Sequence, residues 1–472
     1  MGTSAMEGAF AAMERQVAAR QRADGSARAG PLERLSPLDV SNLRVEDHGL
    51  PMHVAALAIL EAAPLLDAAG QLRLDALREH LERRLHLAPR LRQVLSRPRF
   101  GLGPPLWVDA AAFDIREHVR TRAIPAPGDE AGLLEVCSQL NQPPLDRSRP
   151  LWELWLLTGL ADGTVGLLIR LHHVVADGIA ALALMGALFD AVPDAPSPVA
   201  QPWMPRPVPG AWELFSDNLR RQRGALASAL SAVRRPALPL ERLLSPVRQL
   251  RRLRRQGFAP RVSLNRPVGS HRRLLLVRAD LGRVKEVAHA HGAKVNDVVL
   301  AAVAGGARRL LEARGELQPG LVLSASVAVS VRSPAEQRAG GNRVGIMLVP
   351  LPVGEPDPVR RLERIAQATA EAKRQPAYQP GARFLQRWMV HAMFRQRLVN
   401  LLVSNLPGPA VHLYLYGARV LDLFQVGIVQ GNITVSVGVL SYAGQLNFDL
   451  VSDADAVPDS AVFAQGLADA LG

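Results

Sequence analysis

The chain has 472 residues and a formal net charge of +13, with 48% of its residues hydrophobic and 21% charged. This composition is typical of globular proteins and excludes a mainly disordered chain, and the length favours two large domains. Cys137 is the only cysteine, which excludes an intrachain disulfide and a cysteine-based metal cluster and favours a reducing, cytoplasmic compartment.

No segment has the pattern of a targeting signal or a membrane span. Residues 1–30 carry scattered charges and no apolar core of signal-peptide length, so we expect a flexible N-terminal segment there. The longest uncharged stretch, 425–448, is interrupted by glycine, asparagine, serine and glutamine. If the protein meets a membrane, we expect it to lie on the surface.

The first half of the chain predicts mixed α/β structure. Apolar runs at 53–60 and 164–172 are typical of buried strands, and the leucine spacing at 74–87 indicates an amphipathic helix. The apolar sequence after Gly178 predicts a buried helix. We therefore expect an N-terminal domain over residues 31–192.

A connector follows, with seven prolines between residues 193 and 209. Because proline lacks an amide hydrogen and fixes φ, neither a helix nor a central strand continues through this stretch. Residues 220–261 then contain twelve arginines and one acid, Glu241, which gives this segment a charge of +11. We assign 193–260 to a Pro-rich connector and a basic segment of short helical pieces.

The remaining residues, 261–472, predict a second α/β domain. Strands are expected at 271–281, 321–331, 343–353 and 433–452, and helices at 282–292 and 296–313. Each half therefore holds enough strands and helices for its own sheet. The expected class is α/β, with mixed sheets and flanking helices in two domains.

The strand predicted at 164–172 ends in the sequence RLHHVVADGI, residues 170–179. Successive side chains of a strand face opposite ways, so only one of His172 and His173 can serve a site on a given surface. An imidazole accepts a proton near neutral pH if a neighbour fixes its orientation. Asp177 lies across a turn, where it can pin the loop or neutralise an arginine, and Gly178 permits backbone conformations closed to other residues.

Two other interpretations of the histidine pair stay open. A single histidine on an apolar strand is usually a satisfied core residue, although the Asp-Gly that follows lowers that expectation here. Metal binding is the weaker alternative, because adjacent strand positions diverge and no further cluster of ligand side chains is near in the sequence.

The pattern H-H-x-x-x-D-G at 172–178 resembles the signature of acyl-CoA-dependent acyltransferases, which include chloramphenicol acetyltransferase and peptide-synthetase condensation domains. Further segments narrow the resemblance to the bacterial wax ester synthase/diacylglycerol acyltransferase (WS/DGAT) family. In family order, from about Leu35 to Asp459, these segments are LSPLDVSNLRVEDHGLPMHVAAL (35–57), WVDAAAFDIREHV (107–119), PLDRSRPLWELWLL (144–157), KVNDVVLAAVAGGARRLL (294–311), VAVSVR (327–332), GNRVGIMLVPLP (341–352) and VSNLPGP (403–409). The family usually has valine where Leu406 stands.

The resemblance implies two chloramphenicol-acetyltransferase-like domains with the active site in a channel between them. His173 would act as the general base that deprotonates the acceptor hydroxyl and then protonates the CoA thiolate. No acyl-enzyme is required, which agrees with the absence of a G-x-S-x-G elbow. Asp177 would pair with an arginine to hold the catalytic loop, and Arg332 is the partner that we expect.

The pair Asn296 and Asp297 has two compatible interpretations. On local grounds either residue is the N-cap of the helix that starts there. The family resemblance places the pair at the channel, near the catalytic histidine. Both can hold at once.

By the same resemblance, the protein transfers a long-chain acyl group from acyl-CoA to diacylglycerol, and also to fatty alcohols to form wax esters. Acyl-CoA is a substrate, and no cofactor or metal is implied. The alternatives are an acyltransferase for another alcohol and a catalytically inactive paralogue that binds lipid surfaces.

The basic segment has three open interpretations. It is a solvated charged surface, a peripheral attachment to the inner membrane face or a lipid droplet, or a source of contacts to CoA phosphates. Nucleic-acid binding is not expected, since no aromatic platform or reading motif accompanies the arginines. We expect a cytoplasmic protein that associates peripherally with a lipid surface.

Overall fold

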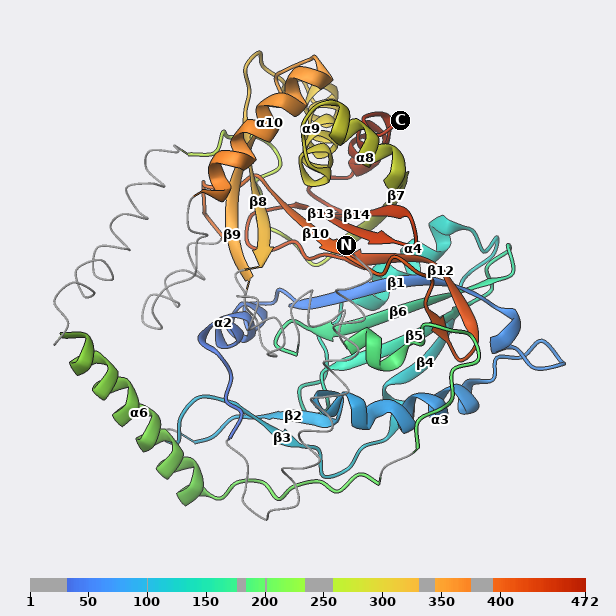
Figure 1. Cartoon of the computed structure of the whole chain (residues 1–472), viewed down its shortest axis with the longest axis vertical. Helices are drawn as coiled ribbons and strands as arrows, with labels where there is room; N and C mark the ends of the chain where they lie inside the picture. Colours follow the sequence, from blue (N-terminus) through green and yellow to red (C-terminus); the bar gives the residue numbers. More distant parts are fainter. Residues whose placement is uncertain are drawn as a thin grey trace.

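The computed structural model describes residues 32–99, 101–175, 184–199, 202–233, 258–330, 344–374 and 394–472. Within these residues the chain forms two lobes, each built on a six-stranded sheet (Figure 1). The predicted α/β class with mixed sheets and flanking helices is confirmed. Among the described helices, none is long and apolar enough to cross a bilayer.

The first sheet has the strand order β11–β12–β1–β6–β5–β4. Its strands are β1 (His53–Glu61), β4 (Val119–Ala123), β5 (Trp152–Thr158), β6 (Thr164–His172), β11 (Tyr414–Leu415) and β12 (Ala418–Val426). Helix α3 (Leu74–Arg84) packs on one face of the sheet through Leu77 and Leu81. Helix α4 (Glu130–Asn141) packs on the other through Leu133 and Cys137. Because both faces are covered, β6 is buried along nearly its whole length.

Two strands of this sheet come from the far end of the chain. β12 pairs antiparallel with β1, with Ala55 opposite Val426. The sequence did not reveal this exchange, because apolar periodicity predicts that a strand exists but not which strand lies beside it. The C-terminal half of the chain thus contributes two strands to the first sheet. The domain bounds predicted from the sequence stay a prediction.

The second sheet has the strand order β7–β14–β13–β10–β8–β9. Its strands are β7 (Arg272–Asp280), β8 (Leu323–Ser330), β9 (Val344–Leu351), β10 (Leu401–Pro407), β13 (Val435–Tyr442) and β14 (Gln445–Asp453). The helices α8 (Leu281–Ala290), α9 (Val295–Ala313), α10 (Pro358–Lys373) and α12 (Ser460–Asp469) gather on the side away from the first lobe (Figure 1). Glycine lets α9 and α12 approach closely, since a Cβ at Gly306 would lie 2.7 Å from the carbonyl oxygen of Phe463.

Smaller elements accompany the first sheet. The helix α2 (Pro37–Glu46) precedes β1, and β2 (Gln93–Ser96) pairs with β3 (Leu106–Asp109). The described parts of the Pro-rich stretch, 193–199 and 202–210, form neither helix nor strand, as predicted. The 23-residue helix α6 (Ala211–Val233) follows, which the sequence analysis had not singled out within the basic segment.

Asp449 of β14 lies fully buried where the two sheets meet. Its Oδ2 accepts a hydrogen bond of 3.0 Å from the amide of Gly427, which directly follows β12. On the neighbouring strand β13, a Cβ at Gly438 would overlap the same carboxyl group, so glycine is required there. Burial disfavours the charged form and raises the pKa of Asp449 to about 7.

We expect Asp449 to make the folded state less stable as the pH rises from about 4 to about 7, because the folded carboxyl keeps a proton that the unfolded one has released. Asp449→Asn removes this titration. Relative to the wild type, its free energy of unfolding should therefore increase across this window, by about 4 kcal/mol at most. Urea denaturation between pH 4 and pH 8 measures the difference. An Asp75→Asn control, with an 82% exposed side chain, should run parallel to the wild type, and an equally parallel Asp449→Asn curve would contradict the assignment.

Candidate active site

The two adjacent histidines at the end of β6 have different surroundings. His172 is the last residue of the strand and has 0% of its surface exposed, whereas His173 is partly exposed and begins a turn. The ring of His172 lies 6.2 Å from the ring of His53, the residue of β1 that pairs with it in the sheet. One histidine therefore belongs to the core, and the other is accessible.

Three hydrogen bonds fix the turn that carries His173. The amide of His173 donates to the carbonyl oxygen of Met52 at 2.8 Å, and the amide of Val175 donates to that of His172 at 2.8 Å. The amide of Val174 donates to Nδ1 of His172 at 3.1 Å. The buried histidine thus holds the backbone on both sides of the accessible one.

The hydrogen bonds of His172 also define its tautomer. Because Nδ1 accepts from a backbone amide, the ring proton resides on Nε2, which donates to Oε2 of Glu46 at 3.1 Å. Both ring nitrogens of His172 are therefore engaged. A general base needs a free lone pair, which His172 lacks in this arrangement.

Glu46, the last residue of α2, is the carboxylate on which this arrangement depends. Besides His172, its Oε2 accepts a hydrogen bond from Nε of Arg147 at 2.8 Å, and its Oε1 lies 3.4 Å from Nε2 of His53. Burial alone would raise the pKa of Glu46, but hydrogen bonds from His172 and Arg147, together with the nearby His53 ring, hold it well below its ordinary value. A permanent negative charge therefore lies beneath the histidine turn.

The sequence analysis missed Glu46. The residue lies within the family segment 35–57, so a signal was present, but nothing in the local pattern assigns that carboxylate to a histidine 126 positions later. The start of α2 was better marked: Ser36 and Asp39 form a reciprocal capping box. This cap fixes the helix whose last residue reaches the site.

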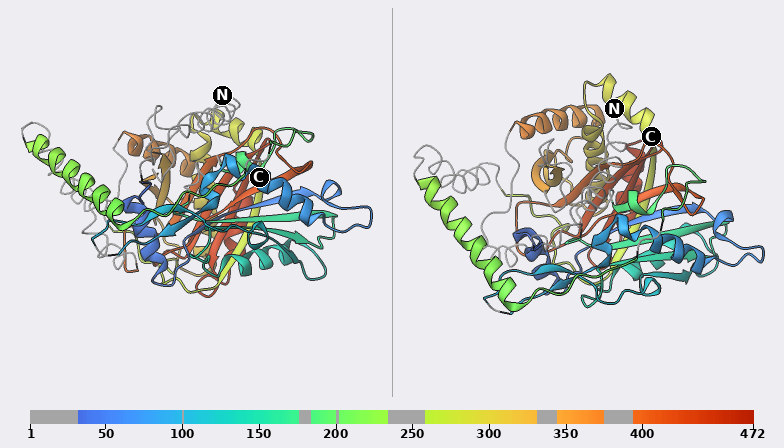
Figure 2. Two further views of the ribbon diagram at one scale, coloured as in Figure 1. Left: turned by 90° about the horizontal axis from the view of Figure 1, so that it is seen from below. Right: turned by 60° about the horizontal axis from the view of Figure 1, so that its bottom comes forward.

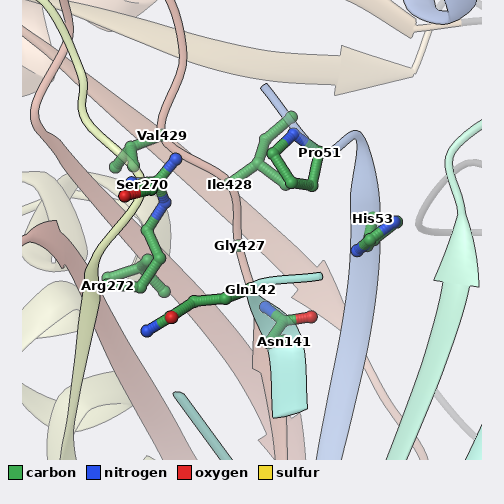
Figure 3. A pocket seen from close by; sticks show the side chains of 10 residues that line it. Pro51, His53, Asn141, Gln142, Ser270, Arg272, Gly427, Ile428 and Val429 are labelled. Atoms are coloured by element: carbon green, nitrogen blue, oxygen red, sulfur yellow. The ribbon is translucent and has the colours of Figure 1, made fainter. Parts of the chain in front are cut away.

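A small cavity of about 20 Å³ lies between the lobes, close to His53 (Figure 3). Its lining residues are Pro51, His53, Asn141, Gln142, Ser270, Arg272, Gly427, Ile428, Val429 and Val451. Burial lowers the pKa of His53, against the opposing attraction of the Glu46 carboxylate. The cavity has room for about one water molecule and not for an acyl chain. The predicted substrate channel stays a prediction.

Asp297 is a structural residue at the start of α9. It is 3% exposed, and its Oδ2 accepts a hydrogen bond of 2.9 Å from the backbone amide of Lys294, the N-cap. Its Oδ1 accepts one of 2.6 Å from the hydroxyl of Thr369 on α10. The prediction that Asn296 or Asp297 is itself the N-cap was wrong, because the N-cap is Lys294, two or three positions earlier. Asp297 is the third residue of the helix, and its carboxylate reaches back to the N-cap amide.

Asn296 joins two of the segments that carried the family resemblance. Its Oδ1 accepts a hydrogen bond of 3.2 Å from Nδ2 of Asn405 on β10. Next to Asn405, the carbonyl oxygen of Ser404 accepts a hydrogen bond of 2.8 Å from Nε2 of Gln425 on β12, which also donates to that of Val439. The side chain of Gln425 therefore ties the first sheet to the second beside Asn296.

Three of the predicted site residues, Asp177, Gly178 and Arg332, lie outside the described residues. The pairing of Asp177 with Arg332 stays a prediction. Within the described part of the chain, no group of three or more His, Cys, Asp or Glu side chains is arranged to hold a metal ion.

Comparison with protein families gives a consistent result over most of the chain. The sequence model of the wax ester synthase/diacylglycerol acyltransferase catalytic domain matches residues 35–299, and that of the WS/DGAT C-terminal domain matches residues 340–472. A Mycobacterium tuberculosis protein named as a probable diacylglycerol O-acyltransferase is 32% identical over 93% of this chain and 95% of its own length. Another protein of that organism, whose diacylglycerol O-acyltransferase name is provisional, is 33% identical over 93% of this chain and 89% of its own.

Solved structures agree with the sequence relatives. The wax ester synthase/diacylglycerol acyltransferase from Marinobacter aquaeolei VT8 superposes with a TM-score of 0.67 at 26% identity, over 93% of this chain and 98% of that one. A starter condensation domain of rhizomide synthetase, solved in complex with C8-CoA, gives a TM-score of 0.57 at 14% identity, over 93% and 95%. The second likeness supports the fold alone. The predicted two-domain, condensation-like fold is confirmed.

We expect His172→Ala and His173→Ala to differ in stability. Removing the buried ring leaves a cavity and unsatisfied groups on Glu46 and Val174, which should lower the free energy of unfolding by about 2–5 kcal/mol. Removing the partly exposed ring should cost about 1 kcal/mol or less. Urea denaturation at pH 7 measures both variants. Equal losses would show that the two histidines do not divide into a core and an accessible residue.

Proposed function

Because the chain belongs to the wax ester synthase/diacylglycerol acyltransferase family, we propose that it is an acyltransferase that moves a long-chain acyl group from acyl-CoA to the free hydroxyl of diacylglycerol. The product is triacylglycerol, and fatty alcohols serve as further acceptors that give wax esters. The observation that carries this proposal is the partly exposed His173, held in a hydrogen-bonded turn at the end of β6. The mycobacterial names favour diacylglycerol as the acceptor, and the Marinobacter name includes both activities.

His173 is the general base in this proposal. Its imidazole takes the proton of the acceptor hydroxyl while the oxygen attacks the thioester carbonyl carbon. The carbon–sulfur bond then breaks, and the departing CoA thiolate receives the proton from His173. The acyl group passes directly to the acceptor, so no acyl-enzyme and no cofactor are needed. Acyl-CoA is consumed as a substrate.

His172 supports this choice of base. Its Nδ1 is occupied by the amide of Val174 and its Nε2–H by Glu46, so the ring has no lone pair for the substrate. We assign to it the positioning of the turn that presents His173. Glu46 keeps the tautomer of His172 fixed, as a carboxylate beside a histidine commonly does.

The remaining predicted residues have supporting roles. Asn296 lies at the junction of the lobes through Asn405, which favours a place beside the channel. Asp177 pairs with Arg332 and, with Gly178, shapes the loop after His173. Asp297 acts through the start of α9 and not on the substrate.

The acceptor lipid also suggests a location. Diacylglycerol resides in membranes and lipid droplets, and the segment 220–261 carries a charge of +11. A basic, leucine-containing segment of this kind favours peripheral attachment to an anionic lipid surface. We therefore propose a cytoplasmic enzyme that works at the inner membrane face or on lipid droplets.

His173→Ala should abolish most product formation. Loss of a general base typically lowers the rate by about 10²–10⁴-fold, so kcat should fall by at least about 100-fold with the fold intact. The measurement is triacylglycerol formation from radiolabelled palmitoyl-CoA. His289→Ala, an exposed histidine on α8, is the matched control and should keep wild-type kcat. An active His173→Ala variant would refute the catalytic assignment.

A panel of acceptors with one acyl-CoA tests the substrate class. We expect dioleoylglycerol and hexadecanol to be acylated by the wild type, with the larger kcat/KM for the diacylglycerol. Turnover only with another alcohol would replace the proposed acceptor. A chain that binds lipid and acylates none of the panel would be the inactive paralogue instead.

A further inference from the structure

Helix α6 exposes a row of large apolar side chains. Trp212 is 78% exposed, Phe215 43%, Leu226 61% and Leu230 57%. With Leu219, these residues follow one another at intervals of three, four, seven and four, which places them on one stripe of an α-helix. Exposed apolar side chains gathered on one face of a helix mark an interaction site more often than scattered ones do.

The opposite side of α6 is fixed to the body of the first lobe. Leu214 is 7% exposed and packs with Leu106 and Val108. Oδ2 of Asp217 accepts a hydrogen bond of 2.7 Å from Nε of Arg34, and Nδ2 of Asn218 donates one of 2.9 Å to the carbonyl oxygen of Gly101. These contacts fix the first two turns of α6, and from Arg220 to Ser231 every described side chain of the helix is exposed. Figure 2 shows α6 projecting along the edge of the molecule.

The charges of α6 are divided along its length. Its two acids, Glu213 and Asp217, lie in the first two turns, and Asp217 is neutralised by Arg34. From residue 218 to the end of the helix there is no acid, while Arg220, Arg221 and Arg223 are exposed. Arg223 lies on the stripe, between Leu219 and Leu226, and Arg220 lies to one side of it. An apolar stripe with arginines of this kind is complementary to a lipid surface with anionic headgroups.

We propose that α6 is the helix by which the protein docks on an anionic lipid surface. The stripe from Trp212 to Leu230 enters the boundary between headgroups and acyl chains, and the arginines contact lipid phosphates. A helix of 23 residues lies flat over about 35 Å in this position. The inference deepens the proposed function, since the acceptor diacylglycerol resides in the same surface.

Charge favours a lipid over a second copy of the chain as the occupant. Two copies that met through α6 would bring their arginine-flanked stripes together, and each chain carries a net charge of +13. Repulsion between them opposes such a dimer at moderate ionic strength. The following segment, 234–257, is also cationic by sequence, with eight arginines and one acid.

Vesicle flotation with the full chain tests the proposal. The wild type should bind vesicles of phosphatidylcholine with phosphatidylglycerol more strongly than pure phosphatidylcholine vesicles. The double variant Leu226→Glu/Leu230→Glu should lose binding by at least about 10-fold, because two apolar side chains no longer insert. The matched control, Ala225→Glu/Ser228→Glu, makes the same change of charge on another face of α6 and should bind at least about 3-fold more tightly than the stripe variant.

Two outcomes would overturn the proposal. Equal vesicle binding by the stripe variant and the wild type would exclude the stripe as the docking face. If the wild type is a dimer and the stripe variant is a monomer with unchanged vesicle binding, the stripe would be a self-association surface. Sedimentation velocity at the same protein concentration measures the second outcome.

An activity assay separates this proposal from the proposed function. Acyl transfer to dihexanoylglycerol dissolved as monomers should be the same for the stripe variant and the wild type, whereas transfer to dioleoylglycerol in anionic vesicles should fall with vesicle binding. A stripe variant that loses both activities equally would point to misfolding or a role in the site, and not to docking. If the wild type acylates neither acceptor but loses vesicle binding on the stripe substitution, the function fails and the docking helix stands.

Discussion

The buried carboxylate of Glu46 is the interaction on which the candidate site depends. It ends α2 and accepts hydrogen bonds from His172 on β6 and from Arg147, while His53 on β1 lies 3.4 Å away. An ionised carboxylate in the interior is costly unless several donors replace the water that it has lost. Here the donors come from separate parts of the chain, so one charge holds the end of α2, the start of β1 and the end of β6 together.

This anchor gives the two adjacent histidines different chemistry. In a regular strand they would differ only in the face that they occupy. In this protein the strand ends between them, and the ring of His172 becomes part of the turn by accepting from the amide of Val174. His172 therefore has a structural role, and His173 is accessible on a backbone that hydrogen bonds hold in place. Preorganisation of this kind is what a general base requires, because a displaced base loses hydrogen-bond reach to its proton.

The sequence predicted the local elements well and their long-range partners poorly. The strand expected at 164–172 coincides with β6, and the helix expected at 296–313 begins one residue earlier, as α9. The family was confirmed as predicted, because its motifs are local strings of residues. The pairing of β12 with β1 joins residues several hundred positions apart, and the contact of Glu46 with His172 joins residues more than a hundred positions apart. The spacing of apolar residues along the sequence carries no information about such contacts. α6 was overlooked for another reason: its neighbours in the sequence are proline-rich, and its apolar stripe is not a core pattern.

The two substrates of the proposed reaction differ in where they reside, and this difference gives α6 a role. Acyl-CoA carries phosphates and partitions between water and lipid, whereas long-chain diacylglycerol stays within a lipid surface. An enzyme that joins these substrates must stay at the lipid surface long enough to meet diacylglycerol. It must also admit acyl-CoA from water. A single amphipathic helix suits this requirement, since its affinity grows with inserted apolar area and with charge but stays reversible. Polar contacts of Asp217 and Asn218 to the first lobe then fix how the lobe that carries His173 is oriented on the lipid.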